Sequence, residues 1–130
     1  MALIDSTTRV KSVIADYDFA VDAGAISTIT LRGDNSVPSG AYILGGFVEV
    51  TTAVTSGGAA TIAVNIEAAG DLIVAAAVSG APWSTTGRKS VVPAFTGATS
   101  LKTTAARSLA ITIATATVTA GKFRVVVFYM

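Results

Sequence analysis

The chain has 130 residues, the size of one domain that can bury a core without disulfides or metals. It contains no Cys and no His, which excludes disulfides and thiolate metal sites and removes the commonest general base. Its net charge is +1 and only 13% of its residues are charged, with no basic stripe, so nucleic-acid binding is disfavoured. A surface this poor in charge indicates that other subunits cover part of it.

The first nine residues are short of any periodic pattern and form a predicted arm, separate from a single domain over residues 10–130. Leu3 and Ile4 are candidate apolar anchors on a neighbouring subunit, and Arg9 is a candidate charge contact. The alternative is a frayed terminus, as is common at chain ends. We expect no signal peptide here and no membrane span, because the longest apolar run, Leu72–Val78, has seven residues where a membrane helix needs about twenty.

Alternating apolar residues predict the first strands. Lys11–Val21 carries an apolar side chain at every second position, and Ile26–Leu31 repeats the pattern over a shorter length. Residues 33–40 are rich in Gly, Pro, Asp and Asn, which predicts a surface loop.

Two further strands follow, and we expect them to pair as a hairpin. Ala41–Thr52 is interrupted by Gly45-Gly46, which indicates a bulge or a close approach of another backbone. Thr61–Ala68 alternates cleanly between apolar and polar residues.

The region after residue 70 is harder to assign. Asp71–Val78 fits a strand, but its initial Asp and its alanines favour a short helical turn or an irregular crossover. Residues 79–99 have no clear period, although Val91-Val92 fits a brief edge strand before Pro93.

The C-terminal segment Arg107–Met130 predicts an antiparallel hairpin with its turn at Ala120-Gly121. Its residues alternate first and then become rich in Val, Phe and Tyr, which suit a packed sheet. Seven or eight short strands separated by turn residues predict an all-β, single-domain antiparallel sandwich or small barrel.

No motif for chemistry stands out, and we expect no catalytic residue, no metal site and no cofactor. Asp16 and Asp18 share one strand face but offer too few oxygens for Ca²⁺, so a solvated face is favoured. Glu49 and Glu67 fall on the predicted hairpin, where Lys102 or Arg124 are candidate partners. Without His, Cys or a nucleophile motif, the chain is not expected to be an enzyme.

Trp83 and Arg88 lie in a long loop and are candidate contacts to a partner. An exposed Trp83 would anchor a protein interface or stack on a sugar; the alternative is an aromatic side chain tucked over the end of the sandwich.

Several segments resemble small structural proteins encoded in tailed-phage genomes, of the head decoration (cement) or head-fibre type. The resemblance covers residues 10–130 and is carried by Tyr17-Asp18-Phe19, Ile29-Thr30-Leu31, Val-Pro-Ser-Gly at 37–40, Trp83-Ser84-Thr85-Thr86-Gly87, residues 101–107 and the closing Ala-Gly-Lys-Phe-Arg-Val-Val-Val-Phe-Tyr. It implies a jelly-roll-like fold, a homotrimer, and a place on the virion surface after synthesis in the host cytoplasm.

The resemblance therefore implies a capsid decoration protein that binds the major capsid protein and stabilises the shell by bridging coat subunits non-covalently. A carbohydrate-binding or host-adhesion module that uses loop aromatics such as Trp83 is the alternative function. In the decoration role, the arm with Leu3, Ile4 and Arg9 and the loop with Trp83 and Arg88 would supply the contacts, since the strands commit one face to the core.

Overall fold

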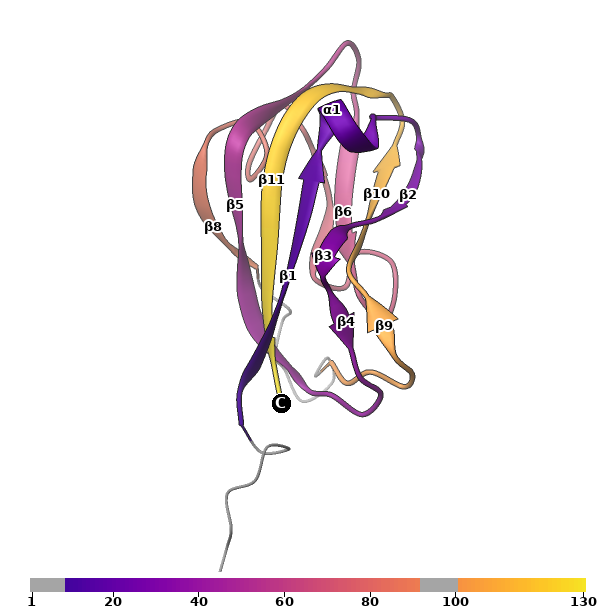
Figure 1. Ribbon diagram of the computed structural model, residues 1–130. Helices are drawn as coiled ribbons and strands as arrows, with labels where there is room; N and C mark the ends of the chain where they lie inside the picture. Colours follow the sequence, from indigo (N-terminus) through magenta and orange to yellow (C-terminus); the bar gives the residue numbers. More distant parts are fainter. Residues whose placement is uncertain (1–8, 92–100) are drawn as a thin grey trace, which may run out of the picture.

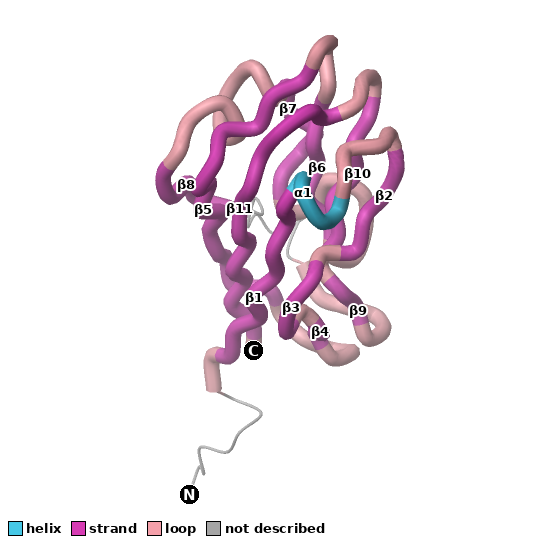
Figure 2. The backbone as a smooth tube through the Cα atoms, turned by 45° about the horizontal axis from the view of Figure 1, so that its top comes forward, coloured by secondary structure: helices cyan, strands magenta, loops and turns pink. Residues whose placement is uncertain are grey.

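The computed structural model describes residues 9–91 and 101–130 as a sandwich of two antiparallel β-sheets, shown in Figures 1 and 2. Leu3, Ile4 and Val92 lie outside the described residues. The all-β sandwich predicted from the sequence is confirmed. The described residues contain no helix long and apolar enough to cross a membrane.

Five strands form the larger sheet and four form the smaller one. The larger sheet has the order β3 (Arg32–Asp34), β1 (Lys11–Asp18), β11 (Val118–Tyr129), β5 (Ile43–Ser56) and β8 (Gly87–Val91). The smaller sheet has the order β2 (Ser27–Thr30), β10 (Ala110–Ala114), β6 (Thr61–Asn65) and β7 (Ile73–Ala77). A two-stranded ladder joins β4 (Ser36–Val37) to β9 (Arg107–Ser108).

The strand order is nested. The first long strand, β1, pairs with the last, β11, while β2 in the other sheet pairs with β10, the strand before the last. Most consecutive strands therefore lie in opposite sheets, and β6 and β7 are hydrogen-bonded neighbours within one sheet. The arrangement is that of an antiparallel β-sandwich in which the chain passes repeatedly from one sheet to the other.

Alternation builds the core between the sheets. Along β1 the side chains of Val13, Ala15 and Tyr17 point inward and are buried, while the residues between them face solvent or are half-buried. At one end of the core, the ring of Phe123 lies 5.0 Å from that of Tyr17 and 4.8 Å from that of Trp83. The hydroxyl of Tyr17 donates to the carbonyl oxygen of Ala23 at 2.7 Å. Burial, followed by the nearby carboxylates of Asp22 and Asp18, raises the pKa of Tyr17 to about 12.

Trp83 is an interior residue. Its side chain is 0% exposed and packs on Phe123, so the exposed indole considered in the sequence analysis is not observed. The loop aromatic tucked into the sandwich is the arrangement found. Its carbonyl oxygen accepts a hydrogen bond from the backbone N–H of Val54 at 3.0 Å, which ties the loop to β5.

The predicted strand over 11–21 ends early because Asp18 caps a helical turn, α1 (Phe19–Asp22). Asp18 accepts a hydrogen bond from the backbone N–H of Ala20 at 3.0 Å, which is the usual role of Asp at a helix N-cap. The predicted loop over 33–40 also contains structure, since β3 and β4 pair with β1 and β9 there.

Both predicted hairpins are wrong. Strand β5 pairs with β11 and β8, whereas β6 pairs with β10 and β7 in the other sheet. The C-terminal strands β10 and β11 likewise separate between the sheets, and the chain crosses at Thr115, which has a φ of 73°. Gly121 lies inside β11 at an irregularity in its pairing with β5, not at the turn.

The helical turn favoured for 71–78 is also wrong, because Ile73–Ala77 forms the edge strand β7. Asp71 organises the preceding turn. Its carboxylate accepts hydrogen bonds from the backbone N–H groups of Ile66, Glu67 and Ala68 at 2.9, 2.8 and 2.7 Å. The capping role expected of Asp71 is thus exerted on a turn and not on a helix.

The prediction for Gly45-Gly46 is confirmed in both of its forms. The register between β5 and β11 shifts between the pairs Phe128–Gly45 and Tyr129–Ile43, so Leu44 lies in a bulge. At Gly46 the neighbouring strand comes so close that a Cβ atom would sit 2.1 Å from the carbonyl oxygen of Val126. No side chain fits there without moving the backbone of β11.

We therefore expect Gly46→Ala to destabilise the protein by about 1–3 kcal/mol, because the methyl group forces apart two strands at the centre of the sheet. The free energy of unfolding, measured by urea denaturation, checks this. Gly57→Ala is the matched control, since a Cβ at Gly57 meets nothing within 4 Å. Equal stability of the two variants would contradict the close approach at Gly46.

Candidate interaction surface

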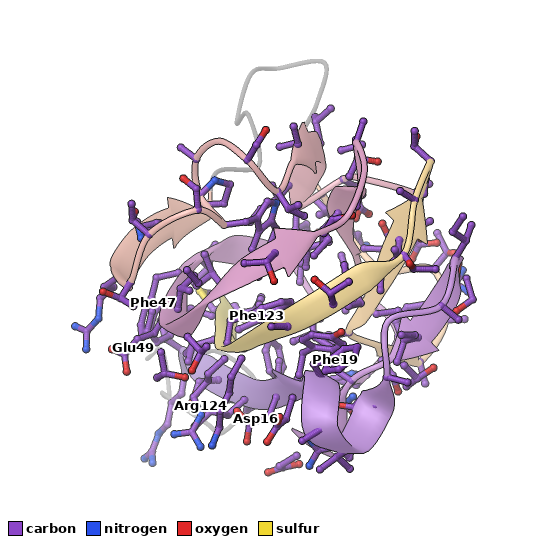
Figure 3. The ribbon with its side chains drawn as sticks, turned by 90° about the horizontal axis from the view of Figure 1, so that it is seen from above. Asp16, Phe19, Phe47, Glu49, Phe123 and Arg124 are labelled. Carbon is purple, nitrogen blue, oxygen red and sulfur yellow. The ribbon has the colours of Figure 1, made fainter. Side chains whose placement is uncertain are left out.

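The outer face of the larger sheet carries a row of alternating charges. Strand pairing places Arg32 (β3), Asp16 (β1), Arg124 (β11), Glu49 (β5) and Arg88 (β8) side by side across all five strands. We call these five residues the charged row. Figure 3 shows Asp16, Arg124 and Glu49 along one side of the molecule, with Phe123 turned toward the interior.

Most charges of this face are paired within the chain. Arg124 donates to both carboxylate oxygens of Asp16, at 2.7 and 3.3 Å, and Arg88 donates to Glu49 at 3.3 Å. The guanidinium of Arg88 also lies over the ring of Phe47, 4.6 Å from its centroid. Opposite charges side by side on neighbouring strands stabilise a sheet, and here they fix the side chains of the row.

Arg32 bonds outside the row, to Asp22 of α1. Its Nε and an Nη donate to the two oxygens of Asp22 at 2.9 and 3.1 Å. Burial raises the pKa of Asp22, but the hydrogen bonds from Arg32 and from the backbone N–H of Asp18 lower it more, so it lies below its usual range. This contact holds α1 against the edge of the sheet.

A hollow of about 410 Å³ lies beside the charged row. Its charged lining consists of three acids and three bases: Asp16, Asp18, Glu49, Arg32, Lys122 and Arg124. Lys122 lies 3.9 Å from Asp18, and Asp16 is bound to Arg124. The carboxylates of Asp16 and Asp18 thus face cationic side chains, and that of Asp18 also caps α1.

From the charged row toward the C-terminal end of β11, the same face of the sheet becomes apolar. The described residues contain nine large hydrophobic side chains that are exposed, and six of them gather at the end of the sheet where β1 and β5 begin and β11 ends. With the half-buried Phe47 they form what we call the apolar patch: Val10, Ile14, Tyr42, Leu44, Phe47, Phe128 and Met130. Figure 1 shows this end of the sheet beside the C-terminus.

Strand register shows that the patch is continuous. Ile14 stands opposite Val126, which stands opposite Phe47, two residues along each strand from the charged row. Val126 is only 8% exposed because these neighbours cover it. The rings of Phe47 and Phe128 lie 6.3 Å apart.

At the end of the sheet, Tyr42 and Met130 exchange two backbone hydrogen bonds of 2.8 and 2.9 Å, which continues the ladder beyond β5 and β11. Lys102 lies over the ring of Tyr42, 5.0 Å from its centroid. The patch thus extends from the charged row to the tip of the sandwich.

The smaller sheet presents a different surface. Its four strands, Ser-Thr-Ile-Thr, Ala-Ile-Thr-Ile-Ala, Thr-Ile-Ala-Val-Asn and Ile-Val-Ala-Ala-Ala, contain no charged residue. On the outer side Thr112 hydrogen-bonds to Thr28 at 3.1 Å and accepts from Asn65 at 2.9 Å. The outer side of this sheet is therefore uncharged and carries small polar side chains that bond to one another.

Glu67, in the loop after β6, links that loop to the segment that leads into β9. Its carboxylate accepts from Arg107 at 2.6 and 3.2 Å, and from the backbone N–H and hydroxyl of Thr104 at 2.8 and 3.0 Å. The hydrogen bonds from Arg107 and Thr104 lower the pKa of Glu67 to about 2. The basic partners expected for Glu49 and Glu67 are thus Arg88 and Arg107, not Lys102 or Arg124.

The candidate contact residues fall in different places. Arg88 lies exposed in the charged row and Arg9 lies exposed just before Val10 of the apolar patch, whereas Trp83 is buried. Sequence reasoning missed Tyr42, Phe47 and Phe128. Alternation places Phe123 and Phe128 on opposite faces of their strand, but only strand pairing shows which face points away from the core.

No protein-family model matches the chain, and no curated protein does. Its fold is similar to chains of solved phage structures. A chain of the cyanophage Pam1 capsid asymmetric unit aligns with a TM-score of 0.65 and 20% identity, over 99% of this chain and 91% of that chain. A chain from the acidic stable capsid structure of Helicobacter pylori bacteriophage KHP30 aligns with a TM-score of 0.62 and 13% identity, over 92% and 86%.

Reversing the central charge of the row tests its role. We expect Arg124→Glu to lower the melting temperature by several degrees, because it places three acids side by side on neighbouring strands. The decrease should shrink in 1 M NaCl, where the Debye length is about 3 Å. Arg124→Gln, which removes the charge without reversing it, should show a smaller decrease and a weaker dependence on salt. A salt-independent effect of Arg124→Glu would contradict an electrostatic role.

The Glu67 contact makes stability depend on pH. The pKa of Glu67 is lowered from an ordinary 4.5 to about 2, so its contribution is complete above pH 4.5 and is lost as the pH falls toward 2. We expect Glu67→Gln to flatten the melting temperature against pH over that window. Melting curves by circular dichroism between pH 2 and 6 check this, and an unchanged slope in the variant would show that Glu67 is not responsible.

Proposed function

We propose that this chain is a structural protein of a tailed-phage capsid, which decorates the shell and stabilises it by bridging coat subunits without covalent bonds. In this role it acts at the virion surface, its partner is the major capsid protein, and it has no enzymatic activity. It works as a homotrimer built from the jelly-roll-like sandwich.

The observation that carries the proposal is the similarity of fold to chains from the capsid structures of two different phages, over 92% and 99% of this chain. Because nearly the whole chain aligns, the match is not a short motif shared by many β-proteins. The sequence segments that resemble small structural proteins of tailed phages agree with this proposal.

The surfaces described above support the same role. A decoration protein needs contacts to other subunits. The apolar patch and the neutral smaller sheet are suited to such contacts because covering them desolvates few charged groups. The adhesion alternative depended on an exposed Trp83, and that side chain is buried. No observation in the described residues favours sugar binding.

The proposal makes a direct prediction for the purified protein. It should sediment as a trimer at micromolar concentration, and it should bind capsids of the parent phage that were assembled without it. Cryo-electron microscopy of such capsids before and after addition would then show extra density at regular lattice positions. Capsids that gain no density, with a correctly folded protein in excess, would overturn the decoration role.

A further inference from the structure

We propose that the apolar patch, made by Val10, Ile14, Tyr42, Leu44, Phe47, Phe128 and Met130, is the surface through which copies of this chain associate with one another. The inference rests on the self-association contained in the proposed function and assigns it a place. The occupant of the patch is thus a second copy of the chain and not the coat protein.

The first argument is the concentration of apolar side chains. Six of the nine exposed large hydrophobic residues among those described lie in this one patch, while the remaining three lie on other elements: Val21 in α1, Ile26 just before β2 and Val74 in β7. Contiguous apolar surface of this kind marks a contact site, whereas single exposed residues are ordinary. Phe, Tyr and Met, which the patch contains, are the residues enriched at protein interfaces.

The second argument is the charged row at one border of the patch. The charged row at its border pairs Arg124 with Asp16 and Arg88 with Glu49, and Arg32 binds Asp22. A partner that covers the patch therefore meets no unpaired charge of this row to neutralise. Because the pairs are already satisfied, a second copy with the same row is not repelled, and an oppositely charged partner gains nothing there.

The third argument is solubility before assembly. A decoration protein exists in solution until it meets a shell. A large apolar surface left open during that time promotes aggregation, so it is best covered permanently, as in the more hydrophobic interfaces of obligate oligomers. The smaller sheet is neutral and carries hydroxyl groups, so it can stay exposed to water before assembly. It is then available for a later contact with the shell.

Charge insertion into the patch tests the inference. Leu44 and Phe128 are 41% and 37% exposed, so Leu44→Glu and Phe128→Glu place a carboxylate on the surface without filling the core. Each should weaken self-association by about tenfold or more in sedimentation equilibrium. Val74→Glu is the matched control: Val74 is 76% exposed but lies on the edge strand of the other sheet, and the variant should keep the oligomer.

A second measurement does not depend on whether the glutamate variants fold. The chain has no Cys, so a single introduced thiol can be cross-linked specifically. Ser12 is exposed and stands opposite Phe128 within the patch. A short bismaleimide should link copies of Ser12→Cys at dilute protein concentration, and should not link copies of Val74→Cys.

The outcomes separate this inference from the proposed function. Patch variants that stay oligomeric, or a Val74→Glu variant that dissociates equally, would overturn the inference. Patch variants that stay oligomeric and lose binding to undecorated capsids would assign the patch to the coat protein. Wild-type protein whose oligomer depends on the patch but which binds no capsid would keep the inference and overturn the decoration role.

Discussion

The central position of β11 is the constraint on which this fold depends. The last strand of the chain lies between the first strand and β5, and its register with β1 brings together Asp16 and Arg124, which are 108 positions apart. The larger sheet is therefore incomplete until the C-terminus is in place. Gly46 permits the close approach of β5 to β11, and the bulge at Leu44 lies next to it within the apolar patch.

The sequence predicted where strands occur better than how they pair. Alternation in β1, β2, β6 and β10 is a local pattern that any half-buried strand must show, so these elements were found. The sequence analysis paired strands that are consecutive in the chain, which is the commoner case. The nested strand order of this protein is an exception to that rule. In β7 the alanines favoured a helix, but the exposed edge of a sheet was available, and tertiary pairing overrode the local propensity.

The candidate site was predicted less well than the fold, and for a related reason. In Phe123-Arg124-Val125-Val126-Val127-Phe128 both faces of the strand carry apolar residues, so the sequence alone does not show that Phe123 is core and Phe128 surface. That distinction requires the register with β1 and β5. Trp83 shows the opposite case: it lies outside the strands, yet its side chain is buried in the core, and among the described residues its indole N–H has no hydrogen-bond partner.

The boundary between the charged row and the apolar patch is the expected limit of the proposed interface. Moving a paired charge out of water is costly even when its partner comes with it, so a subunit that covers the apolar patch is expected to stop short of the Asp16–Arg124 pair. The same ion pairs link neighbouring strands within the sheet, β1 to β11 through Asp16 and Arg124 and β5 to β8 through Glu49 and Arg88. In the proposed assembly the charged row does not touch the partner: its ion pairs link the strands that present the apolar residues, and the row marks where the covered surface ends.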